Sequence, residues 1–211
     1  SSFSPKLIKF GKRFLGTSNI STAIGQDAMA AGTGYACTAI GANSMPSVTG
    51  DRNTAIGVFS GYSLTLGRYN TAIGVHALNF STLAESVTAI GYGASYTNTG
   101  KGTNTAIGAF ALYSFNHATN GGNTSAGYLS TYNLSTGENN TATGERALYS
   151  CTTGSQNTAV GFDCLKLING NFNCAFGLQA GDALTSGNFN TLIGWRALGS
   201  ATGADGVVAV G

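Results

Sequence analysis

The segment Asn70-Thr71-Ala72-Ile73-Gly74 returns, with small changes, twelve times along the 211-residue chain. The glycine that closes each copy serves as an anchor, and successive anchors lie 16 to 19 residues apart. An interval this short leaves room for two short strands and two turns, but not for a pair of helices. The sequence therefore predicts an all-β fold, a parallel β-solenoid of about twelve 16–19-residue coils over residues 17–211. The anchors are Gly25, Gly41, Gly57, Gly74, Gly91, Gly108, Gly127, Gly144, Gly161, Gly177, Gly194 and Gly211.

Most coils carry an asparagine four residues before the anchor. Coils of a parallel solenoid stack at roughly 4.8 Å, so identical amides come within hydrogen-bonding reach of one another. We therefore predict an asparagine ladder along the stack. Its members are Asn53, Asn70, Asn104, Asn123, Asn140, Asn157, Asn173 and Asn190.

The three positions between this asparagine and the anchor hold threonine, a small residue and a β-branched or large apolar residue. Strand side chains alternate, so the first and third positions share one face and the middle position takes the other. We expect the β-branched face to point into the coil, as a core made of Thr54, Ile56, Thr71, Ile73, Ile90, Thr105, Ile107, Val160, Phe176 and Ile193. The small middle column suggests that another backbone approaches closely. We therefore expect subunit packing through Ala55, Ala72, Ala89, Ala106 and Ala159.

Composition agrees with an ordered repeat. The chain holds 32 glycines and only 9% charged residues, which is typical of low complexity, yet 42% of its residues are hydrophobic and the period is strict. We therefore expect an ordered repeat instead of a disordered chain. After each anchor, small-apolar pairs such as Ala77-Leu78 and corners such as Thr136-Gly137 predict a second short strand and a tight turn.

The runs Asn53-Thr-Ala-Ile-Gly57, Asn70-Thr-Ala-Ile-Gly74 and Asn104-Thr-Ala-Ile-Gly108 resemble the repeats of phage and viral tail-fibre proteins. They are also similar to the shorter repeats in the heads of trimeric autotransporter adhesins. The resemblance implies a left-handed parallel β-roll and an intertwined or side-by-side homotrimer. It also implies an extracellular place on a virion or cell surface, with a structural role in attachment to a host or surface receptor.

Residues 1–16 differ in kind from the repeats. They hold Lys6, Lys9, Lys12 and Arg13, interleaved with apolar residues and without an acid. We interpret this segment as a cap over the first coil or as a docking arm for another fibre or virion protein. Membrane-surface binding is a weaker alternative. The rest of the chain carries six Lys and Arg against eight Asp and Glu, and we expect no nucleic-acid partner.

No catalytic or metal-binding constellation stands out. His76 and His117 lie 41 residues apart without a regularly spaced carboxylate. Most coils lack the acid that calcium-binding repeats require, and the four cysteines have no metal-ligand spacing. We expect no catalytic residue, no metal and no cofactor. The cysteines are interpreted as buried thiols that replace residues of similar size, although a Cys164–Cys174 disulfide stays open.

Three alternatives stay open. Aromatic residues that follow the anchors are suited either to packing between chains, which we prefer, or to stacking on surface glycans. The threonine column suggests an ice- or surface-binding solenoid, against which we place the expected inward direction of threonine. A polysaccharide-degrading tail spike needs paired carboxylates, and Glu138 and Glu145 are the nearest candidates.

Overall fold

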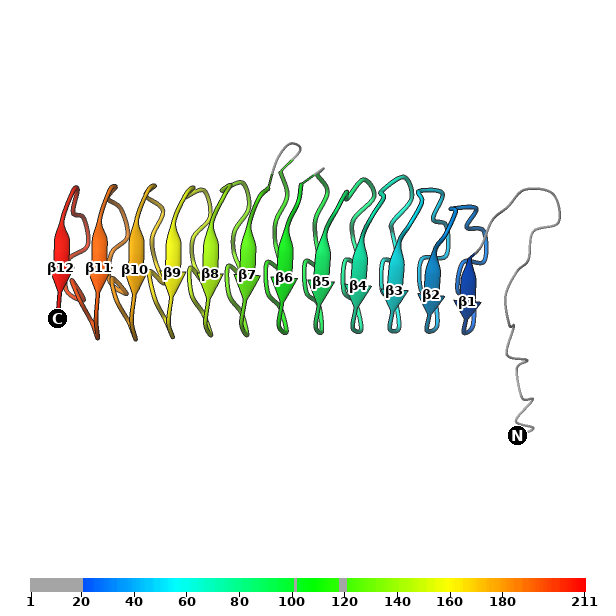
Figure 1. Ribbon diagram of the computed structural model, residues 1–211, viewed down its shortest axis with the longest axis horizontal. Coiled ribbons are helices and arrows are strands. Elements are labelled where there is room, and N and C mark those ends of the chain that lie inside the picture. The colour runs from blue at the N-terminus through cyan, green and yellow to red at the C-terminus, as the bar shows by residue number, and fades with distance from the viewer. Residues whose placement is uncertain (1–20, 101, 118–120) are drawn as a thin grey trace, which may run out of the picture.

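The computed structural model describes residues 21–100, 102–117 and 121–211. Within them the chain forms a rod of twelve three-residue strands that stand in a single row (Figure 1). The strands are β1 (Thr22–Ile24), β2 (Thr38–Ile40), β3 (Thr54–Ile56), β4 (Thr71–Ile73), β5 (Thr88–Ile90), β6 (Thr105–Ile107), β7 (Thr124–Ala126), β8 (Thr141–Thr143), β9 (Thr158–Val160), β10 (Cys174–Phe176), β11 (Thr191–Ile193) and β12 (Val208–Val210). The predicted arm residues Lys6, Lys9, Lys12 and Arg13 lie outside the described part of the chain.

The strands form one parallel sheet in sequence order, from β1 to β12. Each repeat pairs with the same position of the next, so that Thr54 lies beside Thr71 and Ile56 beside Ile73. Eleven turns of about 17 residues connect the strands, which confirms the predicted parallel β-solenoid. At a strand spacing of about 4.8 Å the sheet is about 55 Å long.

The anchor glycines explain the strictness of the period. From Gly25 to Gly194 their φ angles lie between 114° and 144°, in a region that side chains disfavour. A Cβ atom on any of them would lie 1.8 to 2.6 Å from the carbonyl oxygen of the next anchor glycine. The coils can therefore stack closely at this corner only if every anchor is glycine.

The direction of the strand side chains is the reverse of the one expected from the sequence. Instead of forming a contact between subunits, the alanine column is enclosed in its own coil: Ala55, Ala72, Ala89, Ala106 and Ala159 are at most 1% exposed. The residues predicted as core point outward and are half-buried or exposed. They are Thr54, Ile56, Thr71, Ile73, Ile90, Thr105, Ile107, Val160, Phe176 and Ile193.

The narrow interior of the coil explains this correction. Large side chains from the second half of each coil, such as Leu78, Leu112 and Leu148, are fully buried and fill the space behind the sheet. Only a small residue fits opposite them. In β11 Leu192 replaces alanine, and its side chain reaches Gly181 in the coil of β10. The coils of β4, β6 and β8 carry leucine at the position of Gly181, although the coil of β3 also carries a glycine there, Gly61, beside an alanine. A Cβ on Gly181 would lie 2.6 Å from Leu192 Cδ1.

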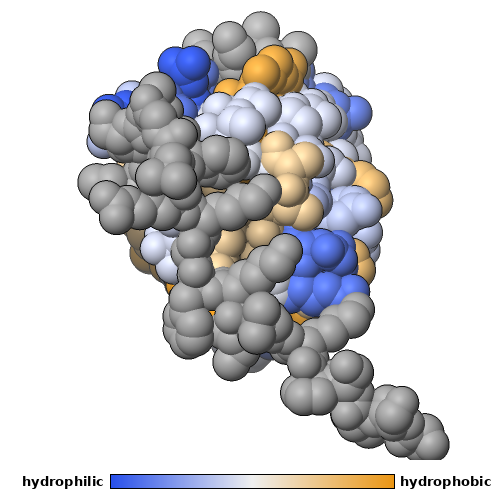
Figure 2. All heavy atoms as spheres, turned by 90° about the vertical axis from the view of Figure 1, so that its right-hand side faces the viewer, coloured by the Kyte–Doolittle hydropathy of each residue, from blue (hydrophilic) through white to orange (hydrophobic). Residues whose placement is uncertain are grey.

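The ends of the rod differ from its sides because their coils have a neighbour on one side only. At the β1 end, hydrophobic and hydrophilic side chains gather in separate patches on the part of the surface that the described residues form (Figure 2).

Among the described residues there is no helix with the length and apolar character needed to cross a membrane.

Candidate functional site

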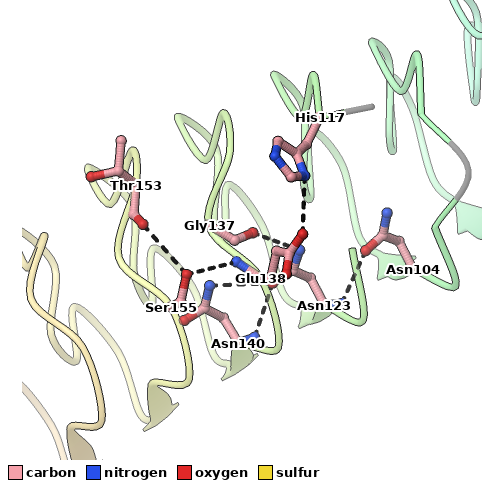
Figure 3. A network of polar contacts seen from close by, with 8 residues as sticks. All are labelled: Asn104, His117, Asn123, Gly137, Glu138, Asn140, Thr153 and Ser155. Atoms are coloured by element: carbon pink, nitrogen blue, oxygen red, sulfur yellow. Dashed lines mark hydrogen bonds and ion pairs between the residues drawn. The ribbon is translucent and has the colours of Figure 1, made fainter. Parts of the chain in front are cut away.

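The asparagine ladder runs inside the rod, where its members are at most 1% exposed. The side chains of Asn104, Asn123 and Asn140 follow one another on successive coils (Figure 3). Most of these amides have two roles: Asn140 Oδ1, for example, accepts a hydrogen bond from the backbone N–H of Asn157 at 2.9 Å, while its Nδ2 donates to Gly154 O at 2.8 Å. Asn104 is an exception, because its Oδ1 accepts from the N–H of Asn123 but its buried Nδ2 has no hydrogen-bond partner among the described residues. The ladder therefore joins neighbouring coils and also closes the corner of most coils. It is a structural element and offers no ligand site.

The outer face of the sheet consists of the threonine column and the isoleucine column. No residue of the twelve strands carries a charge. Several large apolar side chains on this face are widely exposed: Ile56, Ile107, Phe176 and Ile193 are 37 to 46% accessible. The sequence showed that the two columns share a face, but the structure places that face on the surface.

A second apolar column borders the outer face. It is formed by the residue that follows each anchor glycine, and we call it the corner column. Its exposed members are Val58, Val75, Tyr92, Tyr128, Phe162, Leu178 and Trp195. With the isoleucine column they form an apolar stripe along most of the rod, interrupted by Gln26 in the coil of β1 and by Thr143 and Glu145 in the coil of β8. Patches of this extent on a protein surface usually mark an interaction site.

Beyond the corner column, aromatic rings stack from coil to coil. The rings of Tyr96, Tyr113, Tyr132 and Tyr149 follow one another with centroid distances of 4.7, 5.0 and 5.6 Å and interplanar angles of 9° to 12°. Next to them, Phe59 and His76 stack at 5.2 Å. We call this group of rings, together with Tyr92 and Phe110, the aromatic corner.

The aromatic corner contains one gap. Phe59, His76, Gly93 and Phe110 occupy equivalent positions on four successive coils, two residues after their anchors. Since Gly93 has no side chain, a hollow of about 130 Å³ opens there, lined by His76, Tyr92, Gly93, Tyr96, Phe110 and Tyr113. This hollow was not predicted from the sequence, although a glycine between His76 and Phe110 in the same column was a usable local signal.

Polar groups around the hollow are held in place. Asn79 Nδ2 donates to Phe59 O at 3.3 Å and lies 2.6 Å from His76 Nδ1, so Nδ1 acts as the acceptor. The neutral ring then carries its proton on Nε2. Burial, with the neighbouring Tyr96, Tyr132 and Tyr92, raises the pKa of the Tyr113 hydroxyl above its ordinary value. The Nε2–H of this His76 tautomer and the Tyr113 hydroxyl can both donate hydrogen bonds.

Ionic contacts occur elsewhere on the rod. Arg146 makes a two-pronged contact with Asp163, with both distances 2.7 Å, and Lys166 Nζ lies 3.8 Å from the same carboxylate. Glu138 Oε1 lies 3.0 Å from His117 Nδ1 (Figure 3). Glu145 lies at the corner column and is exposed. The two glutamates considered for glycoside hydrolysis thus have different surroundings, one paired with a histidine and the other open to solvent.

The cysteines are all free thiols, and three of them are buried. Burial raises the pKa of the Cys151 thiol to about 11 and that of the Cys164 thiol to about 12. Cys164 Sγ donates to Ala175 O at 3.4 Å, a contact within the core. Among the residues that the structure describes, no three metal-ligating side chains gather in one place.

Comparisons with protein-family models, with curated proteins and with solved structures gave no match. The chain is therefore described by its architecture, a parallel β-solenoid repeat protein.

Proposed function

We propose that this chain is a structural protein, the shaft of a homotrimeric extracellular fibre or adhesin that supports attachment of a virion or cell to a receptor. The proposal assigns it no enzymatic activity. The observation that carries it is the outer face, whose strands hold no charged residue and whose apolar stripe runs along most of the rod. Only a partner of similar length can cover a stripe of this length.

A second copy of the chain fits that requirement better than an unrelated surface. Side chains on the outer face repeat at the strand spacing of about 4.8 Å, in register from β1 to β12. Another copy has the same spacing and the same apolar stripe, so its side chains can pack between the ranks along most of the rod. The proposed number of three chains is taken from the resemblance of the repeats to those of tail fibres and trimeric adhesins. Residues 1–16 remain a candidate docking arm for another fibre or virion protein.

Paired substitutions test the proposed interface. Ile107→Asp with Ile193→Asp places two charges on the outer face, and burial of unpaired charges opposes association. We expect this variant to sediment as a single chain with unchanged far-ultraviolet circular dichroism, while the unaltered chain sediments as a trimer. Thr153→Asp, on an exposed residue outside the strands, is the control and should leave the trimer intact. A double variant that assembles as well as the control would exclude this face as the interface.

A second function, binding of ice or another ordered surface, is favoured by one observation. Threonine occupies this column in ten of the twelve strands, and the column points outward in register. The sequence predicted that threonine points into the coil, which argued against ice binding. The structure places threonine on the outer face, so this argument does not hold. The apolar corner column argues against it, because Tyr92, Tyr128 and Trp195 are exposed at the edge of the same face, next to the isoleucine column.

A measurement of thermal hysteresis distinguishes the fibre function from ice binding. The fibre proposal expects the full chain to show no hysteresis above a buffer control. Hysteresis that disappears in Thr105→Lys would favour ice binding instead.

A further inference from the structure

We propose that the hollow above Gly93 is a binding site for one pyranose ring of a neutral saccharide. This inference rests on the proposed function, because it gives the fibre a receptor contact along its shaft. The ligand would lie between His76 and Phe110, at the position where neighbouring coils carry an aromatic side chain.

The shape of the hollow favours a ring-shaped ligand. His76 and Phe110 belong to coils on either side of Gly93, about two strand spacings or 9.6 Å apart. An inserted ring would thus continue the coil-to-coil stack begun by Phe59 and His76, which lie 5.2 Å apart. Tyr92 stands edge-on to both walls, with centroids 6.2 Å from His76 and 5.0 Å from Phe110.

The size of the hollow limits what can enter. Its volume of about 130 Å³ suits a single ring, and the 51% exposure of Tyr92 shows that one wall reaches the surface. The remainder of a saccharide chain can therefore stay in solvent.

The chemistry of the walls favours a sugar over a charged or purely apolar ligand. None of the six lining residues is an acid, a lysine or an arginine, so nothing there compensates a charged ligand. The rings of Tyr96 and Tyr113 stack at 4.7 Å and offer aromatic surface, and the lining residues His76, Tyr96 and Tyr113 also carry polar atoms. A pyranose combines an apolar C–H face with a rim of hydroxyls, and it can use both kinds of group.

Calorimetric titration of the full chain with chitohexaose, cellohexaose and maltohexaose tests the site. We expect at least one of these neutral saccharides to bind. Gly93→Phe should weaken that binding by about tenfold or more, because the new ring occupies the hollow. Its backbone fits the change, since Phe59, His76 and Phe110 have φ angles of 56° to 58° and Gly93 has 60°. Phe110 has to move slightly, because a Cβ on Gly93 would lie 3.1 Å from it.

Two further variants keep the test decisive. His76→Ala removes one wall and should also weaken binding, even if Gly93→Phe folds poorly. Tyr149→Ala removes a ring at the far end of the tyrosine stack and should bind as the unaltered chain does. The proposal is wrong if none of the three saccharides binds at millimolar concentration, or if Gly93→Phe and His76→Ala both bind normally. Binding of indole without binding of a saccharide would also overturn it, in favour of a planar aromatic ligand.

Light scattering on the same samples separates this proposal from the fibre assembly. If the chain is a trimer but binds none of the saccharides, the proposed binding site is wrong and the proposed assembly is not affected. If the chain is a monomer that binds a saccharide, and Gly93→Phe abolishes this binding, the proposed assembly is wrong and the binding site is not affected.

Discussion

At the scale of single residues, buried polar and thiol groups decide which substitutions the rod tolerates. Asparagine carries both an acceptor and a donor at the tip of a short side chain, so one residue can bond to the next coil and to its own corner. Valine at position 87 shows the limit of this rule. Its backbone N–H still donates to Asn70 Oδ1 at 2.9 Å, but its apolar side chain cannot form a hydrogen bond to the next coil.

Removing one member of the ladder should cost about 2–3 kcal/mol of unfolding free energy, because buried polar groups lose their partners. In Asn140→Ala, the N–H of Asn157 and the carbonyl of Gly154 are affected. Urea unfolding followed by circular dichroism measures the loss. Thr141→Ala, on the exposed neighbour, is the matched control and should change the free energy by less than about 0.5 kcal/mol. Equal losses in both variants would mean that the ladder contributes nothing specific.

The buried thiols predict a fall of stability in alkaline solution. Burial raises the pKa of Cys151 to about 11 and of Cys164 to about 12, against an ordinary value of 9.0 in the unfolded chain. Below about pH 9 both states hold neutral thiols and the stability is complete. As the pH rises from 9 towards 11 or 12, only the unfolded chain ionises, so the unfolding free energy decreases by up to about 1.4 kcal/mol per pH unit for each thiol.

Urea unfolding at pH 8 and pH 10 measures this decrease. The double variant Cys151→Ala with Cys164→Ala is the comparison, since tyrosines and lysines also titrate in this range. The variant should lose less stability between the two pH values than the unaltered chain. An identical loss would assign the effect to other groups.

At the scale of the element, each coil holds a strand whose inward residue must match the residue across the interior. Several coils, such as those of β4, β6 and β8, combine alanine in the strand with leucine four residues after the anchor. Leu192 of β11 lies instead against Gly181 of the preceding coil, where a Cβ atom would lie 2.6 Å from Leu192 Cδ1. Interiors packed to native density respond to changes of a single methylene, so the two positions should be energetically coupled.

A double-mutant cycle tests this coupling. Leu192→Ala should leave a cavity and cost about 2–5 kcal/mol, and Gly181→Leu should overfill the interior at a cost of about 1–3 kcal/mol. The combined variant restores the alanine–leucine pattern of other coils. Its stability should recover in part, because Leu192→Ala removes one of the two close contacts of a side chain at position 181, while the contact with Leu165 Cδ2 at 2.8 Å stays. The backbone permits leucine, since Gly181 has φ 63° and Leu78 and Leu112 have 52° and 50°. Additive losses in the urea unfolding of the three variants would contradict the packing rule.

Much of the fold was predictable from the sequence because the spacing of the anchor glycines fixes a coil of about 17 residues. The direction of the strand was not predictable in the same way. Alternation assigns Ala106 and Ile107 to opposite faces, but it does not say which face is enclosed. The width of the interior decides, and that width depends on residues such as Leu112 from another part of the coil.

The aromatic corner was only partly predictable. The sequence showed that aromatic residues follow the anchors, and the stacking of Tyr96 on Tyr113 follows from their equal positions in successive coils. The hollow at Gly93 depends on the directions of five side chains around it. Those directions are set by backbone angles and ring contacts that the repeat pattern does not specify.

At the scale of the whole molecule, the rod is stabilised by contacts between neighbouring coils, as in other solenoids. Its interior is complete without a partner, since the alanine column and the opposing leucines enclose each other. The outer face is different, because large apolar side chains lie in solvent along most of its length. Association of chains would cover these side chains without any change inside the coil. The account therefore expects folding and assembly to respond to different substitutions.

Sedimentation equilibrium of the full chain tests the central claim, that the outer face holds copies of this rod together. The account predicts a mass of three times the 21.3 kDa of one chain, with a β-rich circular dichroism spectrum. A mass of 21.3 kDa with the same β-rich spectrum, at every concentration examined, would show that the exposed isoleucines remain in water and would contradict it.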